Sequence, residues 1–391
     1  MSFLITALIL LLFIYLYVGI RVIPASRLGR KARILLWIFL VVCMVSVPAA
    51  VAARYLFPTH WISTPLAWFA YGGFGFFTLI LPVLILRDSA WGLRGLIKKF
   101  QAKSEKTTGQ AADPGRRLFL LNTTNAAVLG AGGVLTGYGV AQAVQTPGVV
   151  QVDVPLPKLP AAFHGFKILQ ITDLHVSLTV KADYVRRVVE RSNAQNPDLV
   201  VFTGDMADGP ARELGKEAHP LARLQAPFGK YFVTGNHEYY SGVEGWLSLA
   251  RDIGFTPLLN EHVSLEQAGE KMILAGITDF RAHTIVPDHL SDPDKALKGS
   301  SPDQFRIMLA HQPKSIYQVA PHDVDLMISG HTHGGQYLPW NFMVPLDQPY
   351  VHGLHRHENT QIYVSRGTGY WGPPLRIGAP SEITVLRLVQ A

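Results

Sequence analysis

Residues 166–175 read FKILQITDLH, an apolar run that ends in an aspartate and a histidine. The part FKILQIT is typical of a short buried strand, because it is rich in apolar and β-branched residues. Asp173 and His175 follow at its carboxyl end. In open α/β sheets, side chains at this end of a strand line the crevice in which ligands bind. The stretch therefore predicts an α/β domain with a polar site at one edge of its sheet.

Four further apolar runs end in the same way. The segments that follow them are 204–208 (GDMAD), 235–238 (GNHE), His311 and 330–336 (GHTHGGQ). A single strand-end aspartate is more often a helix cap, and a single Gly-Asn-His is more often a turn. Five such ends in one chain favour a shared site instead. Carboxylate, imidazole and amide donors suit a divalent cation of the Mn, Fe or Zn kind, and they are numerous enough for two ions.

Other segments complete the α/β pattern of the C-terminal 240 or so residues. We expect strands at 199–203, 230–234, 271–276, 305–310, 324–329, 361–365 and 382–388, an edge strand at 152–157, and helices at 181–193 and 244–252. A polar loop at 279–301 is long enough to border the site.

The blocks DLH, GDMAD, GNHE, His311 and GHTHGGQ resemble, in this order, the five motifs of the calcineurin-like metallophosphoesterase family. The resemblance covers about residues 168–336, and the tail that contains Gly and Arg is similar to bacterial members. It implies an αββα sandwich, with two packed sheets flanked by helices and a two-metal site at the strand ends. It also implies roles for individual residues. The first ion would take Asp173, His175 and His333, the second Asn236, His311 and His331, and Asp205 would bridge both.

The same resemblance implies a catalytic residue and two supporting residues. His237 would face the substrate as proton donor to the leaving group or as stabiliser of the phosphoryl group. Asp208 and Glu238 would orient the ligands and the backbone. The implied reaction is phosphoester hydrolysis by a hydroxide that bridges the two metals, and we favour a phosphodiester over a monoester. The alternative is a non-catalytic sensor or scaffold, which loss of His237 or of a ligand would have indicated; none is lost.

Several residues outside these blocks have two open interpretations. Arg366 and Arg376 are candidates for binding a substrate phosphate, and a surface ion pair explains them equally well. A solvated patch explains the histidines at 352, 355 and 357 better than a third metal site does. Core packing is the favoured role of the aromatic residues at 239, 240, 340, 370 and 371 over contact with the crevice or with lipid.

The N-terminal part of the chain has the composition of a membrane region. Among 391 residues, 48% are hydrophobic and 16% are charged, and one cysteine excludes an intramolecular disulfide. Uncharged apolar runs at 2–20, 34–53 and 66–86 are each close to the ~20 residues that span a bilayer as a helix. A fourth segment, 115–143, begins GRRLFLL and ends AQA, so it resembles a twin-arginine export signal. We favour an uncut anchor over cleavage after Ala143.

The loop charges predict the orientation. Loops 21–33 and 87–117 are rich in Lys and Arg, which places them in the cytoplasm by the positive-inside rule. We therefore expect a membrane region at 1–145 with three to four transmembrane helices. The phosphoesterase domain, 146–391, would lie on the outer face of a bacterial inner membrane.

The distribution of charge also bears on binding partners. Residues 1–117 hold 14 of the 35 Lys and Arg and three of the 28 Asp and Glu, so the basic excess belongs to the membrane part. The remaining domain is mildly acidic, which argues against nucleic acid as a partner. We expect a phosphoester substrate, with a lipid-linked one favoured by the membrane tether, and the sequence leaves the oligomeric state open.

Overall fold

The computed structural model describes residues 2–104 and 114–391 and divides into two compact units. The first unit holds Met1–Ala52 and Pro65–Val140, and the second holds Ala53–Thr64 and Ala141–Ala391. The linker between the second and third long helices thus belongs to the C-terminal unit by its contacts.

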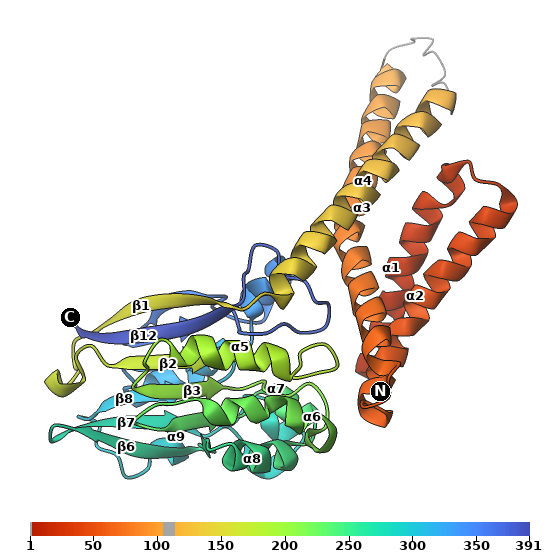
Figure 1. The fold of residues 1–391 in the computed structure, drawn as a ribbon. Helices are drawn as coiled ribbons and strands as arrows, with labels where there is room; N and C mark the ends of the chain where they lie inside the picture. Colours follow the sequence, from red (N-terminus) through yellow and green to blue (C-terminus); the bar gives the residue numbers. More distant parts are fainter. Residues whose placement is uncertain (1, 105–113) are drawn as a thin grey trace. The chain divides into compact units, whose positions relative to one another are not determined.

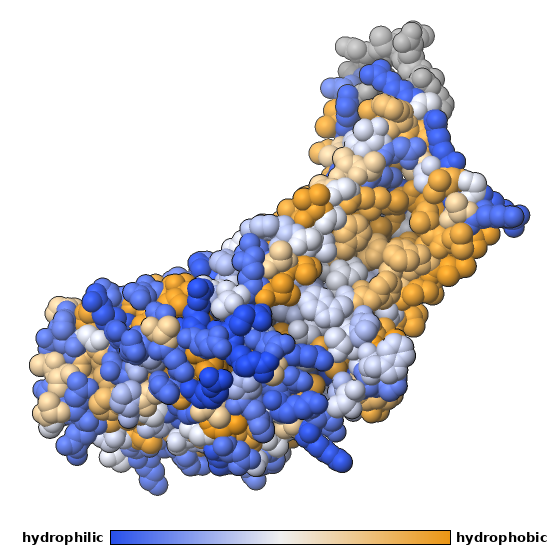
Figure 2. Space-filling model, viewed as in Figure 1, coloured by the Kyte–Doolittle hydropathy of each residue, from blue (hydrophilic) through white to orange (hydrophobic). Residues whose placement is uncertain are grey.

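Four long helices build the N-terminal unit: α1 (Ser2–Val22), α2 (Arg30–Leu56), α3 (Ser63–Ser104) and α4 (Pro114–Val144) (Figure 1). Each is long and apolar enough to cross a membrane, with a best-window mean hydropathy between 1.4 and 2.7. Their outer faces carry large apolar side chains such as Ile9, Leu35 and Leu86, which are 63%, 65% and 70% exposed. Figure 2 shows these hydrophobic surfaces in orange. The predicted apolar helical segments are confirmed.

Helix α3 differs from the expected 21-residue span. It runs for 42 residues and extends to Ser104, into the stretch that we expected to be a cytoplasmic loop. Residues 87–104 contain no proline, so nothing forces the helix to end where its apolar character ends. Hydropathy marks the limit of a span and not the limit of a helix. Of the rest of the expected loop, 105–113 lies outside the described residues and 114–117 form the start of α4.

A polar cluster connects three of these helices. Asp88 of α3 accepts a hydrogen bond from the Tyr17 hydroxyl and forms an ion pair with Arg21 of α1, both at 2.6 Å. Arg87 donates to the side-chain oxygen of Asn125 of α4 at 2.5 Å, and Asn125 donates to the carbonyl oxygen of Arg21 at 3.1 Å. The neighbouring core consists of apolar residues from α1, α2 and α3.

The C-terminal unit contains two six-stranded sheets (Figure 1). The first has the order β1-β12-β2-β3-β4-β5, with β1 (Gly148–Leu156), β12 (Glu382–Gln390), β2 (Lys167–Ile171), β3 (Leu199–Thr203), β4 (Lys230–Val233) and β5 (Thr256–Pro257). The second has the order β10-β11-β9-β8-β7-β6, with β10 (Gly353–His357), β11 (Thr360–Val364), β9 (Leu326–Ser329), β8 (Phe305–Leu309), β7 (Glu270–Gly276) and β6 (Glu261–Gln267).

Alternation along the strands separates three apolar layers. Ile168 of β2 faces an inner cluster that contains residues of both sheets, while its neighbour Leu169 faces an outer cluster. That outer cluster includes side chains of α5 (Ala182–Asn193), α6 (Ala211–Ala218) and α8 (Val243–Asp252). A third cluster covers the far face of the second sheet with α9 (Pro293–Leu297) and α10 (Ile316–Val319). Each fully buried Leu or Ile contributes about 1.5–3 kcal/mol. The predicted two-sheet α/β sandwich is confirmed.

Strand direction brings the predicted site together. Strands β2, β3 and β4 are parallel neighbours, and so are β7, β8 and β9. The carboxyl ends of parallel strands lie at one edge of a sheet, so the segments that follow β2, β3, β4, β8 and β9 meet there.

Some elements were missed by sequence reasoning. The short strand β5, the hairpin strand β6 and helix α6 lie outside the predicted elements. The histidines at 355 and 357 lie in the edge strand β10, which was not among the predicted strands. The expected loop at 279–301 contains short helical turns, among them α9.

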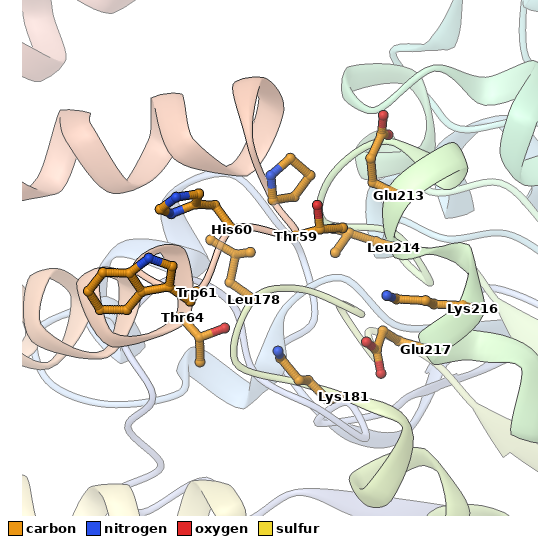
Figure 3. A pocket seen from close by; sticks show the side chains of 11 residues that line it. Thr59, His60, Trp61, Thr64, Leu178, Lys181, Glu213, Leu214, Lys216 and Glu217 are labelled. Atoms are coloured by element: carbon orange, nitrogen blue, oxygen red, sulfur yellow. The ribbon is translucent and has the colours of Figure 1, made fainter.

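The linker 53–64 lines a cavity of about 300 Å³ in the C-terminal unit (Figure 3). Pro58, Thr59, His60, Trp61 and Thr64 line it together with Leu178, Lys181 and residues of α6. The described lining residues include none of those predicted to bind metal. The cavity is therefore a feature of the linker and not of the candidate metal site.

The expected processing site at 141–143 lies inside α4. Ala143 is fully buried and belongs to the outer apolar cluster of the first sheet. Because a peptidase needs an extended, accessible segment, this placement favours the uncut anchor.

Candidate metal centre

The structure gathers the predicted ligands at the strand ends. Asp173 and His175 follow β2, Asp205 follows β3, and Asn236 begins α7 (Asn236–Tyr240) after β4. His311 follows β8, and His331 and His333 follow β9. Six of these seven residues are less than 10% exposed, and the seventh, His331, is half-buried. Side chains that are up to 160 positions apart in the chain thus lie together at one edge of the sheets.

The ligand loops use an unusual backbone conformation. Asp173, His175, Asp205, His331 and His333 all have positive φ angles, between 50° and 71°. Few residues other than glycine adopt this left-handed region, although Asp and His do so more often than most. Strained backbone of this kind clusters at functional sites, where the surrounding structure maintains it.

Two glycines explain how the loops approach so closely. A β-carbon on Gly235 would lie 2.2 Å from Asp205 Oδ1, and one on Gly330 would lie 2.3 Å from Asp173 Oδ2. Neither position has room for a side chain. The Gly-Asn and Gly-His pairs of the motifs therefore reflect close packing of one ligand loop on another.

A first group of donors consists of Asp173, His175 and His333, whose ligand atoms lie within 4.8 Å of one another. The Nε2 atoms of His175 and His333 are 3.0 Å apart, and His333 Nε2 lies 3.4 Å from Asp173 Oδ1. Asp173 is held in place by the Thr172 hydroxyl at 2.7 Å and by the backbone N–H of His331 at 2.9 Å.

A second group consists of Asp205, His311 and His331. His311 Nε2 lies 3.2 Å from Asp205 Oδ2 and 3.1 Å from His331 Nδ1. The other ring nitrogen of His311 hydrogen-bonds the carbonyl oxygen of Thr203 at 2.7 Å, which fixes the ring. Asp205 Oδ2 also lies 3.7 Å from His175 Nε2, so this one oxygen is close to both groups.

The residues present fit two divalent cations. Two pairs of imidazole nitrogens point at each other beside Asp205, an arrangement that a shared cation would stabilise. Within the described part of the chain, the buried side-chain oxygen of Asn236 has no hydrogen-bond partner, although buried polar atoms normally have one. A neutral oxygen and imidazole nitrogens are common ligands of Mn, Fe and Zn.

Electrostatics also favour metal ligation. Burial lowers the pKa of His175 and of His331 to about 3, so both rings are neutral and offer lone pairs. Burial also opposes protonation of His311, but the nearby Asp205 carboxylate outweighs it and raises the pKa of His311 to about 10. A cation at this position would take the place of that proton.

His237 lies next to His175 of the first donor group, and it is not a member of the second donor group. Its Nδ1 is 3.2 Å from Asp208 Oδ1, and its ring packs edge-on against His175 at 4.6 Å. Although burial disfavours the charged ring, Asp205 and Asp208 together raise the pKa of His237 above its ordinary value. Rings of Tyr240 and Trp371 lie 5.4 and 5.8 Å away. The His237 imidazole can therefore serve as a proton donor, and aromatic rings lie on one side of it.

Glu238 connects two ligand loops through the backbone. Its carboxylate accepts hydrogen bonds from the N–H groups of Gly235 at 2.7 Å, Asp205 at 2.9 Å and Ala207 at 3.0 Å. Burial, together with the charge of Asp205, raises the pKa of Glu238 to about 7, and the three N–H donors oppose that rise. Glu238 therefore holds the backbone of Asp205, the candidate bridging ligand, in position.

Replacing Glu238 with glutamine tests this role. We expect metal affinity to fall about 10–100-fold, because the new amide nitrogen faces a backbone donor and one N–H loses its acceptor. Competition with a fluorescent chelator measures the affinity. The control is Glu244→Gln, an exposed glutamate of α8. Equal affinities in the two variants would contradict the role.

The two candidate phosphate-binding arginines have different surroundings. Arg376 is 1% exposed, and its guanidinium donates to the carbonyl oxygens of His333 and Arg366 at 2.8 Å and lies 3.0 Å from His333 Nδ1. Burial is the main cause that lowers the pKa of His333, and the positive charge of Arg376 lowers it further, so the ring stays neutral. Arg366 pairs with Glu382 at 3.4 Å. Arg376 is thus a supporting residue of His333, a role that motif reasoning missed.

The histidines at 352, 355 and 357 lie apart from these donors. His355 hydrogen-bonds the carbonyl oxygen of His352 at 2.7 Å, and His357 contacts the Tyr350 hydroxyl at 3.1 Å. Among the described residues, they belong neither to the two groups above nor to a third metal-capable group, which His175, Asp208 and His237 form.

Comparison with known proteins agrees with this geometry. The sequence profile described as Calcineurin-like phosphoesterase matches residues 166–335. A protein of Helicobacter pylori, described as an uncharacterized metallophosphoesterase, is 40% identical over 260 residues, which are 65% of this chain and 68% of that protein. The chain belongs to the calcineurin-like phosphoesterase family.

Other relatives of this calcineurin-like phosphoesterase occur in bacteria and animals. The metallophosphoesterase YkuE of Bacillus subtilis is 36% identical over 286 residues, which are 70% of this chain and 97% of YkuE. A Danio rerio protein named "Transmembrane protein with metallophosphoesterase domain" is 41% identical over 267 residues, 66% of this chain. The aligned part spans 61% of the Danio rerio protein, about three fifths of its length.

Proposed function

We propose that this protein is a membrane-anchored, two-metal phosphoesterase that acts on phosphodiesters. The observation that supports this most strongly is the pair of Asp/His groups that meet at Asp205. In this proposal Asp173, His175 and His333 hold one ion. Asn236, His311 and His331 hold the second, and Asp205 bridges the two.

The metals and the protein would share the work. When bound, two cations supply positive charge for the phosphate oxygens and promote deprotonation of the attacking water. Asp205 is suited to its position, since its carboxylate is anionic and its Oδ2 lies close to both ligand groups. Asn236 contributes a neutral oxygen, which limits the negative charge that faces an anionic substrate. His237 would give a proton to the leaving oxygen, and Asp208 would orient its ring.

Preference for a diester with an apolar leaving group is supported by the rim of the site. The leaving group would lie near His237, whose ring is close to Tyr240 and Trp371. These two aromatic residues are 54% and 48% exposed, so their faces remain available for contact with a substrate. A lipid-linked phosphodiester fits such a rim and fits a domain that is tethered to a bilayer.

Substitution of Trp371 tests this preference. For a diester with an octyl leaving group, we expect Trp371→Ala to lower kcat/KM about tenfold, since roughly 1.4 kcal/mol of apolar contact is lost. For the ethyl analogue we expect little change. The control is Tyr317→Ala, an aromatic residue that is 60% exposed. Equal losses on both substrates would argue against an apolar subsite.

The proposed location is a bacterial inner membrane, with the phosphoesterase domain on its outer face. The arginine-rich loop after α1 and the basic stretch around 116–117 support a cytoplasmic position of those loops. A reporter enzyme fused after Ala391 tests the orientation. Alkaline phosphatase activity is expected, because that reporter is active outside the cytoplasm, and activity of a cytoplasm-dependent reporter would refute the orientation.

The activity itself is tested with the full chain in detergent. Removal of metal by a chelator should abolish hydrolysis of an aryl phosphodiester, and Mn²⁺ should restore it, with the monoester hydrolysed more slowly. A faster monoester reaction would overturn the diester preference. A protein that binds metal but hydrolyses none of a broad panel of phosphoesters would favour the sensor or scaffold alternative.

A further inference from the structure

Arg54 approaches the candidate metal centre from outside the family's motifs. It lies in the last turn of α2, inside the candidate span Arg30–Leu56 and at the start of the segment Ala53–Thr64. By its contacts this segment is part of the C-terminal unit. Arg54 is only 8% exposed, which is unusual for an arginine.

The Arg54 side chain is directed to Asp208. Its Nη1 forms an ion pair with Asp208 Oδ1, and the two side chains are 10% and 6% exposed. The aliphatic stem packs over Gly209, where an added β-carbon would lie 3.1 Å from Arg54 Cγ. Gly209 is itself held by Ser241, which accepts its N–H at 3.0 Å, and by Trp246, which donates to its carbonyl oxygen at 2.9 Å.

Asp208 contacts His237 as well as Arg54. The same oxygen, Oδ1, that pairs with Arg54 lies 3.2 Å from His237 Nδ1. A carboxylate held by a guanidinium on one side has a fixed position for the imidazole on its other side. Without Arg54, Asp208 would keep one strong partner instead of two, and the orientation of the His237 ring would be less well defined.

We propose that Arg54 is a positioning residue for hydrolysis, which acts through Asp208 to hold His237 where it can protonate the leaving group. The active site is then completed by the last turn of a candidate membrane span and not by the phosphoesterase motifs alone. Arg54 pairs with Asp208, which belongs to neither of the two ligand groups, so its loss should leave metal binding intact. This inference rests on the proposed function, because it needs His237 to serve as proton donor.

Leaving-group dependence tests the proposal in the full-length, metal-loaded chain. Arg54→Met is expected to lower kcat about 10–100-fold on an alkyl phosphodiester, whose leaving group needs a proton, and less than threefold on a nitrophenyl diester, whose leaving group does not. Arg54→Lys, which keeps the charge but not the planar fork, should recover part of the loss. Arg30→Met, an exposed arginine at the other end of α2, is the matched control.

A double-mutant cycle separates positioning from a structural role. In a His237→Gln background, Arg54→Met should have no further effect on the alkyl diester, since the residue it positions is gone. Equal losses on both substrates, additive losses in the double variant, or loss of bound metal in Arg54→Met would each overturn the proposal. If Arg54→Met does not fold, the same comparisons with Arg54→Lys decide the question. Absence of activity in the wild-type protein would instead refute the proposed function.

Discussion

Asp205→Asn is expected to lower kcat/KM by about 10³-fold or more and to reduce the metal content below two ions per chain. One side-chain oxygen of Asp205 lies near both ligand groups, 3.2 Å from His311 and 3.7 Å from His175. Asparagine has nearly the same shape, but it is neutral, and when its oxygen keeps the hydrogen bond from the His237 N–H its NH2 group takes the place of Oδ2 and cannot bind a cation. The effect should exceed the 10–100-fold that supporting partners of a metal site usually contribute.

The measurement combines steady-state kinetics with elemental analysis of the same preparation. The other oxygen of Asp205 accepts the backbone N–H of His237 at 2.9 Å, and asparagine can keep this hydrogen bond. We therefore expect the far-UV circular dichroism to be unchanged. Asp252→Asn, an exposed aspartate at the end of α8, is the matched control. An Asp205→Asn protein that retains wild-type activity would refute the two-metal mechanism.

His237→Gln is expected to lower kcat on alkyl phosphodiesters by about 10²–10⁴-fold, the usual contribution of a general acid. The His237 ring lies 3.2 Å from Asp208 and edge-on to His175, so it borders the metal centre without being needed for either ligand group. Metal content should therefore stay at the wild-type level. This combination of intact metal binding and lost turnover distinguishes a proton donor from a ligand.

A comparison of substrates whose leaving groups differ in basicity makes this test specific for proton donation. Nitrophenyl diesters should lose much less activity than alkyl diesters, because their leaving group departs without a proton. His219→Gln, an exposed histidine after α6, is the control. A uniform loss across leaving groups would indicate that His237 stabilises the phosphoryl group instead, which is the other role considered for it.

Much of the fold and the site could be predicted because their signals are local. Each strand-end block contains an apolar run followed by a donor residue, and in three of the five a glycine stands between them, as in LVVFTGD at 199–205. Runs of this kind predict both the strand and the place where the chain turns. The donor types then indicate cations without any knowledge of the tertiary structure. For this reason the strands β2, β3, β4, β8 and β9 were found with boundaries close to those observed.

The residues that were missed act through contacts between distant parts of the chain. Arg54 pairs with a residue 154 positions away, and Arg376 contacts His333 across 43 positions. No periodicity or spacing marks such pairs. The three backbone N–H groups on Glu238 and the positive φ angles of the ligand loops likewise become visible only in three dimensions. Helix α3 was misjudged for a different reason, since apolar composition marks a membrane span but not the end of a helix.

The position of the metal ions tests the central claim most directly. Crystals of the full-length protein grown with Mn²⁺ should give two anomalous scattering peaks, roughly 3.5–4 Å apart. One peak should lie among Asp173, His175 and His333, the other among Asn236, His311 and His331, and Asp205 should contact both. A single peak, or two peaks that do not share Asp205, would contradict the account.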